Sequence, residues 1–238
     1  GGANSRYNTV NGCTFTNNIA HGNTTGTITR GGGAIYWSEG GYYGTIKDSK
    51  FYNNSVQSTI DKKVDGGAVL WDKSKHALVD TCIFVGNFVT TEGDDIGDKG
   101  AKSVWAQGGA MYLRPNANYT VRNCHFENCS SSKEAGALYI QGKLGSSDFM
   151  IKLEDSVFIN NVAQAKGKNN INGGGAIQIK QCPNSNFTNL IFINNTANMG
   201  GALSVFTSVC NLIIDGANFT SNKAVNGSAI YSTSSYTL

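Results

Sequence analysis

Two short phrases alternate along the whole chain. The first is a Phe followed three residues later by a polar residue, which is Asn in six of the seven copies. The second is Gly-Gly-Ala followed by an aliphatic residue or Met, again in seven copies, two of which replace one Gly by Ala or Ser. The first phrase begins at Phe15, Phe51, Phe84, Phe126, Phe158, Phe192 and Phe219, and the second has its Ala at positions 34, 68, 110, 137, 176, 202 and 229. Interleaved in this register, the phrases predict a repeat protein.

Hydrophobic and polar positions within each repeat predict three short strands. After the Ala, the first and third residues are apolar in nearly every copy, as in Ile35 and Trp37, and this alternation is typical of a strand with one buried side. The Ala itself is then predicted to face outward. Trp37 and Trp71 are predicted to stack in the core, with an aromatic platform for sugar stacking as the alternative. An apolar residue five positions before each Phe marks a second strand, and the Phe marks a third. Gly and Asn between the strands supply the left-handed backbone that corners need.

Three short strands per coil predict an all-β fold, a single-stranded right-handed parallel β-helix (β-solenoid) with about seven to eight coils. The shortest gaps on either side of the Gly-Gly-Ala phrase add to about 26 residues, which suits one coil of a solenoid. The handedness follows from the strong preference of parallel crossovers. Successive Phe should then stack in the core, and the Asn should form a ladder that Cys129 interrupts. Residues 1–238 are predicted to form one such domain, as part of a longer chain or an assembly, because the repeats run to both ends.

Composition and charge exclude several other classes of protein. Gly accounts for 30 of 238 residues, but only 2 Pro and no Gly-X-Y period are present, so the chain is not a collagen. Lys and Arg exceed Asp and Glu by only three (19 against 16), too few for a dedicated nucleic-acid binder. No apolar run approaches the roughly 18 residues that a membrane-spanning helix needs.

The interleaved phrases resemble the repeats of the polymorphic outer membrane proteins of chlamydiae and of similar adhesin-like surface proteins. Seven copies of Phe-x-x-Asn and Gly-Gly-Ala-[Ile/Leu/Val] or a close variant cover nearly the whole chain. Departures from the pattern are Cys129 in place of Asn and Ser228 in place of Gly. The resemblance implies a β-helical protein at the cell surface with an adhesive role.

Candidate catalytic and metal-binding groups are sparse. Parallel β-helices that cleave acidic polysaccharides need clustered carboxylates, and the only acidic cluster lies in the connection 88–107 and matches no calcium-loop pattern. The three His are far apart in sequence, and no Cys/His pair has the spacing of a zinc site. The sequence therefore predicts no enzymatic activity, no cofactor and no metal.

Two groups of residues are candidates for binding. An outward stripe of tyrosines two positions after the Ala is a candidate for contact with a partner or a glycan. It consists of Tyr36, Tyr112, Tyr139 and Tyr231. The second group lies in the connection 88–107 and consists of Glu92, Asp94, Asp95, Lys99 and Trp105.

Four long connections between the two phrases are predicted to form a lateral ridge. Insertions in a solenoid stack on one face, which is often the binding face. The connections are 19–30, 55–65, 88–107 and 162–173, and the third is the longest. Shortening 88–107 is expected to leave folding intact and to weaken binding.

The six cysteines and eight sequons fit an extracellular protein. Cys182 with Cys210 is the first candidate disulfide and Cys82 with Cys124 the second, because each pair falls in adjacent coils. Replacing Cys129 by Asn is expected to be neutral or mildly stabilising. The candidate glycosylation sites are Asn23, Asn53, Asn118, Asn128, Asn186, Asn194, Asn218 and Asn226.

Three functions remain on these grounds. The first is a non-enzymatic extracellular surface protein, an adhesin-like β-helix that binds a cell-surface protein or glycan through its lateral loops. The alternative is a structural subunit that stacks end to end with further copies of itself into an extracellular filament. The third and weakest is a polysaccharide lyase or hydrolase. The sequence predicts no nucleic-acid partner and no membrane insertion within this chain.

Overall fold

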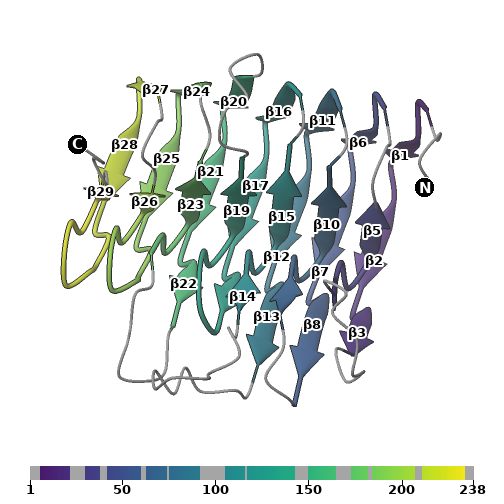
Figure 1. The fold of residues 1–238 in the computed structure, drawn as a ribbon, viewed down its shortest axis with the longest axis horizontal. Helices are drawn as coiled ribbons and strands as arrows, with labels where there is room; N and C mark the ends of the chain where they lie inside the picture. Colours follow the sequence, from purple (N-terminus) through teal and green to yellow (C-terminus); the bar gives the residue numbers. More distant parts are fainter. Residues whose placement is uncertain are drawn as a thin grey trace.

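The chain winds into parallel coils that lie side by side along the long axis of the molecule (Figure 1). The computed structural model describes residues 6–21, 30–37, 42–59, 63–73, 75–91, 105–115, 117–142, 150–164, 173–181, 184–206 and 211–233. Within these ranges it contains strands and no helix, and each strand pairs in parallel with the equivalent strand of the next coil. The predicted parallel β-helix is confirmed.

Three sheets run the length of the solenoid, with seven strands each. Sheet 1 consists of β1 (Thr9–Asn11), β6 (Thr45–Lys47), β11 (Ala77–Asp80), β16 (Tyr119–Arg122), β20 (Met150–Glu154), β24 (Asn184–Thr188) and β27 (Asn211–Asp215). Sheet 2 consists of β2 (Thr14–Thr16), β7 (Lys50–Tyr52), β12 (Ile83–Val85), β17 (His125–Glu127), β21 (Val157–Ile159), β25 (Ile191–Ile193) and β28 (Asn218–Thr220). Sheet 3 consists of β5 (Ile35–Trp37), β10 (Val69–Asp72), β15 (Met111–Arg114), β19 (Leu138–Gln141), β23 (Ile177–Lys180), β26 (Leu203–Phe206) and β29 (Ile230–Thr233).

Two shorter sheets, which the sequence did not predict, form at the base of the long connections. Sheet 4 consists of β3 (Ile19–His21), β8 (Ser55–Ser58), β13 (Phe88–Thr91), β18 (Ser130–Ser131) and β22 (Val162–Ala163). Sheet 5 consists of β4 (Arg30–Gly31), β9 (Val64–Asp65) and β14 (Ala106–Gln107). Val56, Val64, Val89 and Ala106 form a small apolar cluster between them. The long connections therefore begin and end in register on one side of the solenoid, and 88–91 and 106–107 belong to its framework. The middle parts of the connections lie outside the described residues, so the ridge itself stays a prediction.

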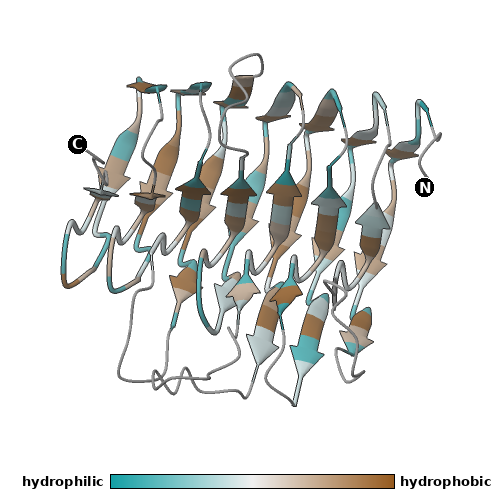
Figure 2. Cartoon of the chain, in the orientation of Figure 1, coloured by the Kyte–Doolittle hydropathy of each residue, from teal (hydrophilic) through white to brown (hydrophobic). Residues whose placement is uncertain are grey.

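The Phe column fills the centre of the solenoid. Neighbouring rings are stacked with centroids 4.7 to 5.2 Å apart from Phe15 through to Phe219. The five Phe between these two are fully buried, and the strands carry alternating hydrophobic and hydrophilic bands in Figure 2. Trp71 is buried and its ring packs edge-on against Trp37, so the core position predicted for the Trp pair is confirmed.

The Asn column forms a hydrogen-bonded ladder beside the Phe column. Asn161 is typical: its Nδ2 donates to the carbonyl of Phe126 and to Oδ1 of Asn195, each at 3.0 Å, and its Oδ1 accepts the backbone N–H of Cys129 at 3.0 Å. Each amide thus satisfies buried backbone groups of the preceding coil and hydrogen-bonds the Asn side chain of the next coil. At the interruption, the Cys129 thiol faces the carbonyl of Phe84 at 3.6 Å, where an Asn would place its amide.

The glycine phrase is explained by the corner that leads into sheet 3. The first Gly has a positive φ, as in Gly32 (67°) and Gly108 (72°), and Ala135 adopts the same left-handed conformation (55°) in the fourth copy. At the second Gly, a Cβ on Gly67 would collide with the carbonyl oxygen of Gly109 in the next coil.

The prediction that the following Ala faces outward is wrong. Ala68 and its equivalents pack in the hydrophobic core, because the chain bends at this corner and strict alternation begins only afterwards. The bend shows in the hydrogen bonds: the N–H groups of Ala34 and Ile35 both donate to the carbonyl of Ala68, at 2.9 and 3.0 Å. The core therefore accepts only a small side chain at this position.

Candidate functional site

The predicted tyrosine stripe exists as a column on the outer face of sheet 3, but two of its members are not exposed. Strand register places Tyr36, Leu70, Tyr112, Tyr139, Gln178, Ser204 and Tyr231 in equivalent positions. Tyr36 is 42% exposed and Tyr231 is partly buried, whereas Tyr112 and Tyr139 are fully buried, with stacked rings 5.2 Å apart. The prediction of an exposed stripe is therefore wrong at its centre.

A second column faces these tyrosines from the corner that precedes the glycine phrase. Asp65 and Gln107 are paired residues of sheet 5, and Glu134 continues the column through a parallel bridge to Gln107. All three side chains are buried. Polar side chains from sheet 5 thus pack against the outer surface of sheet 3, which is why the tyrosines there lose their exposure.

Hydrogen bonds join the two columns around Glu134. Gln107 Nε2 donates to Oε2 of Glu134, and Gln178 Nε2 donates to Oε1 at 3.2 Å. The Tyr139 hydroxyl donates to Oε1 of Gln141 at 3.2 Å. Glu134 is thus held by amides from the coils on either side of it, which fixes its position on the outer surface of the sheet.

Asp65 lacks such partners. Its side chain is fully buried, and neither carboxylate oxygen accepts a hydrogen bond. The nearest cation is Lys63, whose Nζ lies 3.5 Å from Oδ2 in a long ion pair. Gln178 Oε1 is likewise buried without a donor. Two buried acceptors in one site therefore have unused hydrogen-bonding capacity.

Cations form the outer rim of the site and rest on aromatic rings. Lys63 Nζ lies 5.3 Å from the centre of the Tyr112 ring, and Arg114 lies 5.7 Å from the same ring. Arg114 also pairs with Asp72 across neighbouring strands, with 2.8 Å between the charged atoms. One coil beyond Glu134, Lys180 lies over the ring of Trp105 at 5.3 Å. An aromatic ring therefore positions each rim cation. A carboxylate also positions Lys63 and Arg114.

Burial dominates the protonation of the acids. Desolvation raises the pKa of Asp65 from 3.8 to about 7, although Lys63 and Arg114 act in the opposite direction. Desolvation also raises the pKa of Glu134, against the hydrogen bonds from Gln107 and Gln178 and the charge of Lys180. The pKa of Tyr139 is raised by burial and then by Glu134. Partial protonation of Asp65 near neutral pH leaves the rim cations less than fully neutralised.

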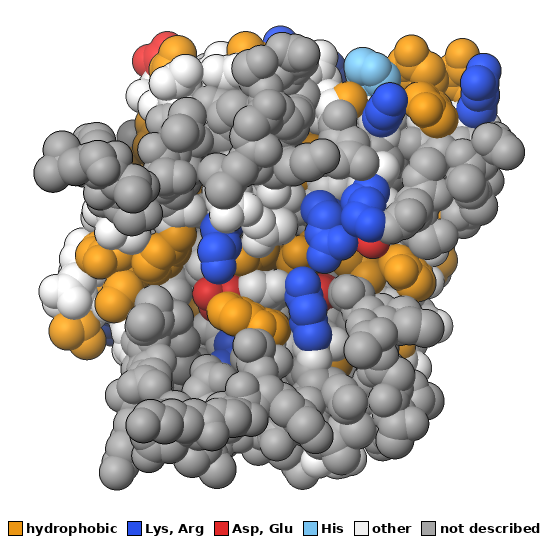
Figure 3. Space-filling model, in the orientation of Figure 1, with side chains coloured by type: hydrophobic (Ala, Val, Ile, Leu, Met, Phe, Trp, Pro, Cys, Tyr) orange, Lys and Arg blue, Asp and Glu red, His pale blue; other side chains and the backbone are white. Residues whose placement is uncertain are grey.

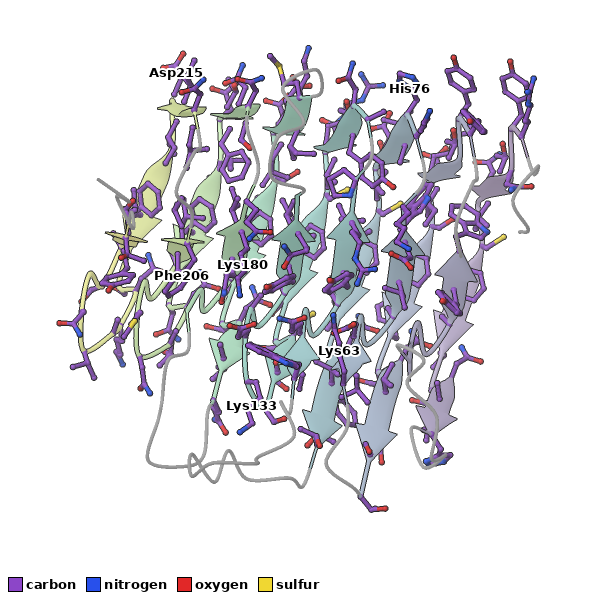
Figure 4. All side chains as sticks on the ribbon, in the orientation of Figure 1. Lys63, His76, Lys133, Lys180, Phe206 and Asp215 are labelled. Carbon is purple, nitrogen blue, oxygen red and sulfur yellow. The ribbon has the colours of Figure 1, made fainter. Side chains whose placement is uncertain are left out.

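These residues define the outer-face site. Its buried part consists of Asp65, Gln107, Tyr112, Glu134, Tyr139 and Gln178, and its rim of Lys63, Trp105, Arg114 and Lys180. Figure 3 shows basic, acidic and hydrophobic side chains gathered in a band across the middle of this face, and Figure 4 marks Lys63 and Lys180 along it. The site presents cations and aromatic rings outward, with hydrogen-bonding groups beneath them.

Of the residues predicted from the sequence, the structure brings Tyr112, Tyr139 and Trp105 together in this site. Glu92, Asp94, Asp95 and Lys99 lie outside the described residues. Sequence reasoning missed the residue before the glycine phrase, where Asp65, Gln107 and Glu134 follow one another in successive coils. Alignment of the seven copies exposes that position, because the other copies carry Gly, Met or Asn there.

Cys82 and Cys124 lie in adjacent coils as expected, but the structure holds both as free thiols rather than as a disulfide. Their thiols face the carbonyl groups that end the preceding strands, Asp80 of β11 at 3.2 Å and Arg122 of β16 at 3.0 Å. Burial raises the pKa of Cys124, so this thiol is unreactive at neutral pH. Cys182 and Cys210 lie outside the described residues.

The sequons are mostly accessible. Exposed side chains are those of Asn53, Asn118, Asn128, Asn194, Asn218 and Asn226, whereas Asn186 is half-buried. Asn23 lies outside the described residues. The exposed side chains are accessible to modification, and glycosylation of these sites stays a prediction.

Metal-binding and membrane-spanning features were also sought. Within the described ranges, no three His, Cys, Asp or Glu side chains are grouped so that they could hold a metal ion. No helix in the same part of the chain has the length and hydrophobicity to cross a membrane.

Residues 12–36 match the family model of the Chlamydia polymorphic membrane protein repeat. The matched segment runs from the corner before Phe15 through Gly32-Gly33-Ala34 and into β5, so it spans one copy of each phrase. The resemblance inferred from the repeated phrases is confirmed, and it indicates a surface, adhesin-like protein. Comparison with curated proteins and with solved structures gave no match.

Proposed function

Because the chain carries the repeat of the Chlamydia polymorphic membrane proteins, we propose that it is a non-enzymatic, adhesin-like protein of the cell surface or outer membrane. It binds a cell-surface protein or glycan with one side of the solenoid. That side comprises the outer face of sheet 3, with the outer-face site, and the ridge built on sheets 4 and 5.

One observation carries this proposal. Charged and polar side chains that differ from coil to coil, and that the repeat does not need for folding, are concentrated on the side of the solenoid from which the long connections leave. Inward positions repeat the same residue types in almost every coil. On the outer face, Asp65, Gln107 and Glu134 replace one another at a single position. These varying buried side chains support the rim cations Lys63 and Arg114, which reach solvent and are available for recognition.

Binding is favoured over polysaccharide cleavage by the burial of the acids. A glycosidase acid and base must both reach the scissile bond. Asp65 is fully buried and Glu134 is only 6% exposed, whereas the rim cations Lys63 and Arg114 reach solvent. Incubation with acidic polysaccharides and measurement of reducing-end or unsaturated-sugar release tests this point, and sustained release by the wild type would contradict the proposal.

Cell binding tests the proposed surface. We expect Lys63→Gln with Lys180→Gln to weaken attachment of the labelled protein to host-type epithelial cells about 5- to 30-fold, since two rim charges are lost. The matched control is Lys47→Gln with Lys152→Gln, which removes the same charge from exposed positions of sheet 1. Equal loss in both variants would show that only net charge matters, and no loss in either would reject this surface.

A further inference from the structure

A second group of exposed aromatic and basic residues lies at the corner that leads into sheet 1. Tyr7 and Tyr43 stack with ring centroids 5.3 Å apart, and Tyr43 stacks on His76 at 4.9 Å. Tyr7 is 70% exposed, Tyr43 is 47% exposed, and His76 is exposed at the edge of the molecule in Figure 4. Three successive coils therefore present a continuous column of aromatic rings to solvent.

The backbone at this corner does not favour aromatic residues. Tyr7, Tyr43 and His76 have φ angles of 57°, 54° and 55°, in the left-handed region that Gly and Asn adopt with least strain. Most corners elsewhere in the solenoid carry Gly, Asn or Asp at such positions, as at Gly12 and Asn17, although a few others, such as Lys73, Thr81 and Gln181, also have a positive φ. Bulky rings in three strained positions are therefore explained by what the side chains do, which is to stack and to face solvent.

A column of cations runs beside the rings. Arg6 lies 5.6 Å from the centre of the Tyr42 ring, and Lys75 lies 5.2 Å from it on the other side. Parallel bridges join Arg6 to Tyr42 and Tyr42 to Lys75, so the cations are two coils apart, about 10 Å along the axis. Figure 4 shows this edge above the ends of β1, β6 and β11.

Within the described ranges these cations have no carboxylate partner, unlike Lys63 and Arg114 of the outer-face site. Among the described residues, no ion pair involves Arg6 or Lys75, and their positions are set by the uncharged ring between them. Both side chains are exposed. Their charge is therefore available to an anion from outside the molecule.

We propose that this corner, defined as the aromatic corner (Arg6, Tyr7, Tyr42, Tyr43, Lys75 and His76), binds an anionic polysaccharide. The chain lies along the solenoid axis, with its sulfate or carboxylate groups at Arg6 and Lys75 and its sugar rings against the tyrosines. The spacing of the cations is comparable to the length of a disaccharide, so acidic groups on alternate sugars meet successive cations.

A polysaccharide fits this corner better than an acidic polypeptide. Tyr42 is bridged on both sides, to Arg6 and to Lys75, so a peptide cannot add as a strand between these coils. Recognition must come from side chains, and exposed rings with flanking charges suit the apolar faces and acidic groups of sugars. This inference goes beyond the proposed function, because it concerns a different surface from the outer-face site.

Heparin, as a model anionic polysaccharide, tests the proposal. We expect the wild type to bind immobilised heparin, to bind neutral dextran not at all, and to release heparin as ionic strength rises. Arg6→Gln with Lys75→Gln should weaken heparin binding about 5- to 30-fold. The control Lys47→Gln with Lys152→Gln, which removes the same charge from sheet 1, should change it less than about twofold.

Replacement of the rings separates binding from folding. Tyr7→Asn with Tyr43→Asn places a residue that tolerates positive φ at both positions, so we expect the variant to stay folded and to lose heparin binding. His76→Asn also keeps a residue that tolerates positive φ, and it should weaken heparin binding because it removes the last ring of the stacked column.

Three results would overturn the proposal. The first is unchanged heparin binding in both corner variants. The second is loss of heparin binding in the outer-face variant Lys63→Gln with Lys180→Gln but not in the corner variants, which would assign the glycan to the other face. The third is that poly-glutamate binds as tightly as heparin and competes with it. That result would identify an acidic polypeptide, and not a polysaccharide, as the ligand of the corner. Cell attachment measured on the same variants reports separately on the proposed function.

Discussion

The inward Phe and Asn columns carry the same side chain through successive coils, whereas the outer-face site changes its chemistry from coil to coil. Phe51, Phe84 and Phe126 stack with nearly parallel rings, so the neighbours of each ring in the column are other Phe rings. On the outer face, Leu70 is followed by Tyr112, Tyr139 and then Gln178 at one position. The inward columns and the inner part of the outer-face site are both buried. Burial alone therefore does not require the same residue type in every coil.

The difference teaches which positions hold the coils in register. Most inward hydrogen bonds are satisfied by the next copy of the repeat, as the Asn ladder shows. The outer-face site leaves Asp65 Oδ1 and Gln178 Oε1 without donors. We therefore expect changes to the inward columns to be destabilising and changes to the outer-face site to be neutral or stabilising.

The largest loss is expected in the Asn ladder. Asn161→Ala leaves the N–H of Cys129 buried without a partner, removes the side-chain donor to the carbonyl of Phe126, and opens a gap between coils. Unfolding by urea should show a loss of about 3–5 kcal/mol. Asn186→Ala, at a half-buried position of sheet 1, serves as the control and should cost less than about 0.5 kcal/mol. A similar small cost at Asn161 would show that the ladder does not hold the coils together.

The opposite sign is expected at Asp65. Its pKa is raised from 3.8 to about 7 in the folded protein, so the folded state binds a proton more tightly than the unfolded state. Ionisation of Asp65 therefore reduces stability as pH rises from about 4 to above 7, and Asp65→Asn removes that penalty. The variant should gain about 2–4 kcal/mol at pH 8 and little at pH 4.

Asp80 provides the matched comparison, because the Arg122 guanidinium hydrogen-bonds its carboxylate and lowers its pKa. Asp80→Asn should lose a few tenths of a kcal/mol at pH 8, and that loss should vanish as pH falls below about 4. Thermal melts of both variants across this pH range decide the matter. A destabilised Asp65→Asn at pH 8 would mean that the ionised carboxylate has a partner that the outer-face site needs.

A smaller gain is expected at the corner glycine position. Ala135 holds a left-handed conformation that Gly adopts in the other copies, so Ala135→Gly should stabilise the protein by about 1 kcal/mol. The reciprocal change, Gly108→Ala, places a Cβ against the Met111 carbonyl and should destabilise it. Urea midpoints that move in the same direction for both variants would contradict this account of the corner.

The smallest effect is expected at Cys129. Burial raises the pKa of this thiol to about 12, so it stays neutral and fills the ladder as a small apolar residue. Cys129→Asn would restore the donor to the Phe84 carbonyl and the acceptor for the Asn87 N–H. We expect a change between zero and about 1 kcal/mol of stabilisation. A large drop in melting temperature would show that the thiol has a role that the ladder does not explain.

The repeated parts of the molecule were predictable from the sequence, because position in the repeat fixes position in space. The Phe stack, the Asn ladder and the shared column of Tyr112 and Tyr139 all followed from counting residues. The burial of those tyrosines did not, because it depends on sheet 5, whose strands are two residues long and have no period of their own. The aromatic corner was missed for a related reason: Tyr7, Tyr43 and His76 occupy a left-handed position that residue type does not predict.

The claim that inward columns build the fold while one side of the solenoid binds is tested most directly by shortening the connection 92–104 to two or three residues. This change spares β13 and β14, and the connection 143–149 between β19 and β20 supplies a control deletion at another corner. Melting temperature and attachment to epithelial cells are measured on the same samples. The account predicts a melting temperature within about 4 °C of the wild type and clearly weakened attachment for the 92–104 variant alone. Attachment equal to that of the wild type, with the fold intact, would contradict it.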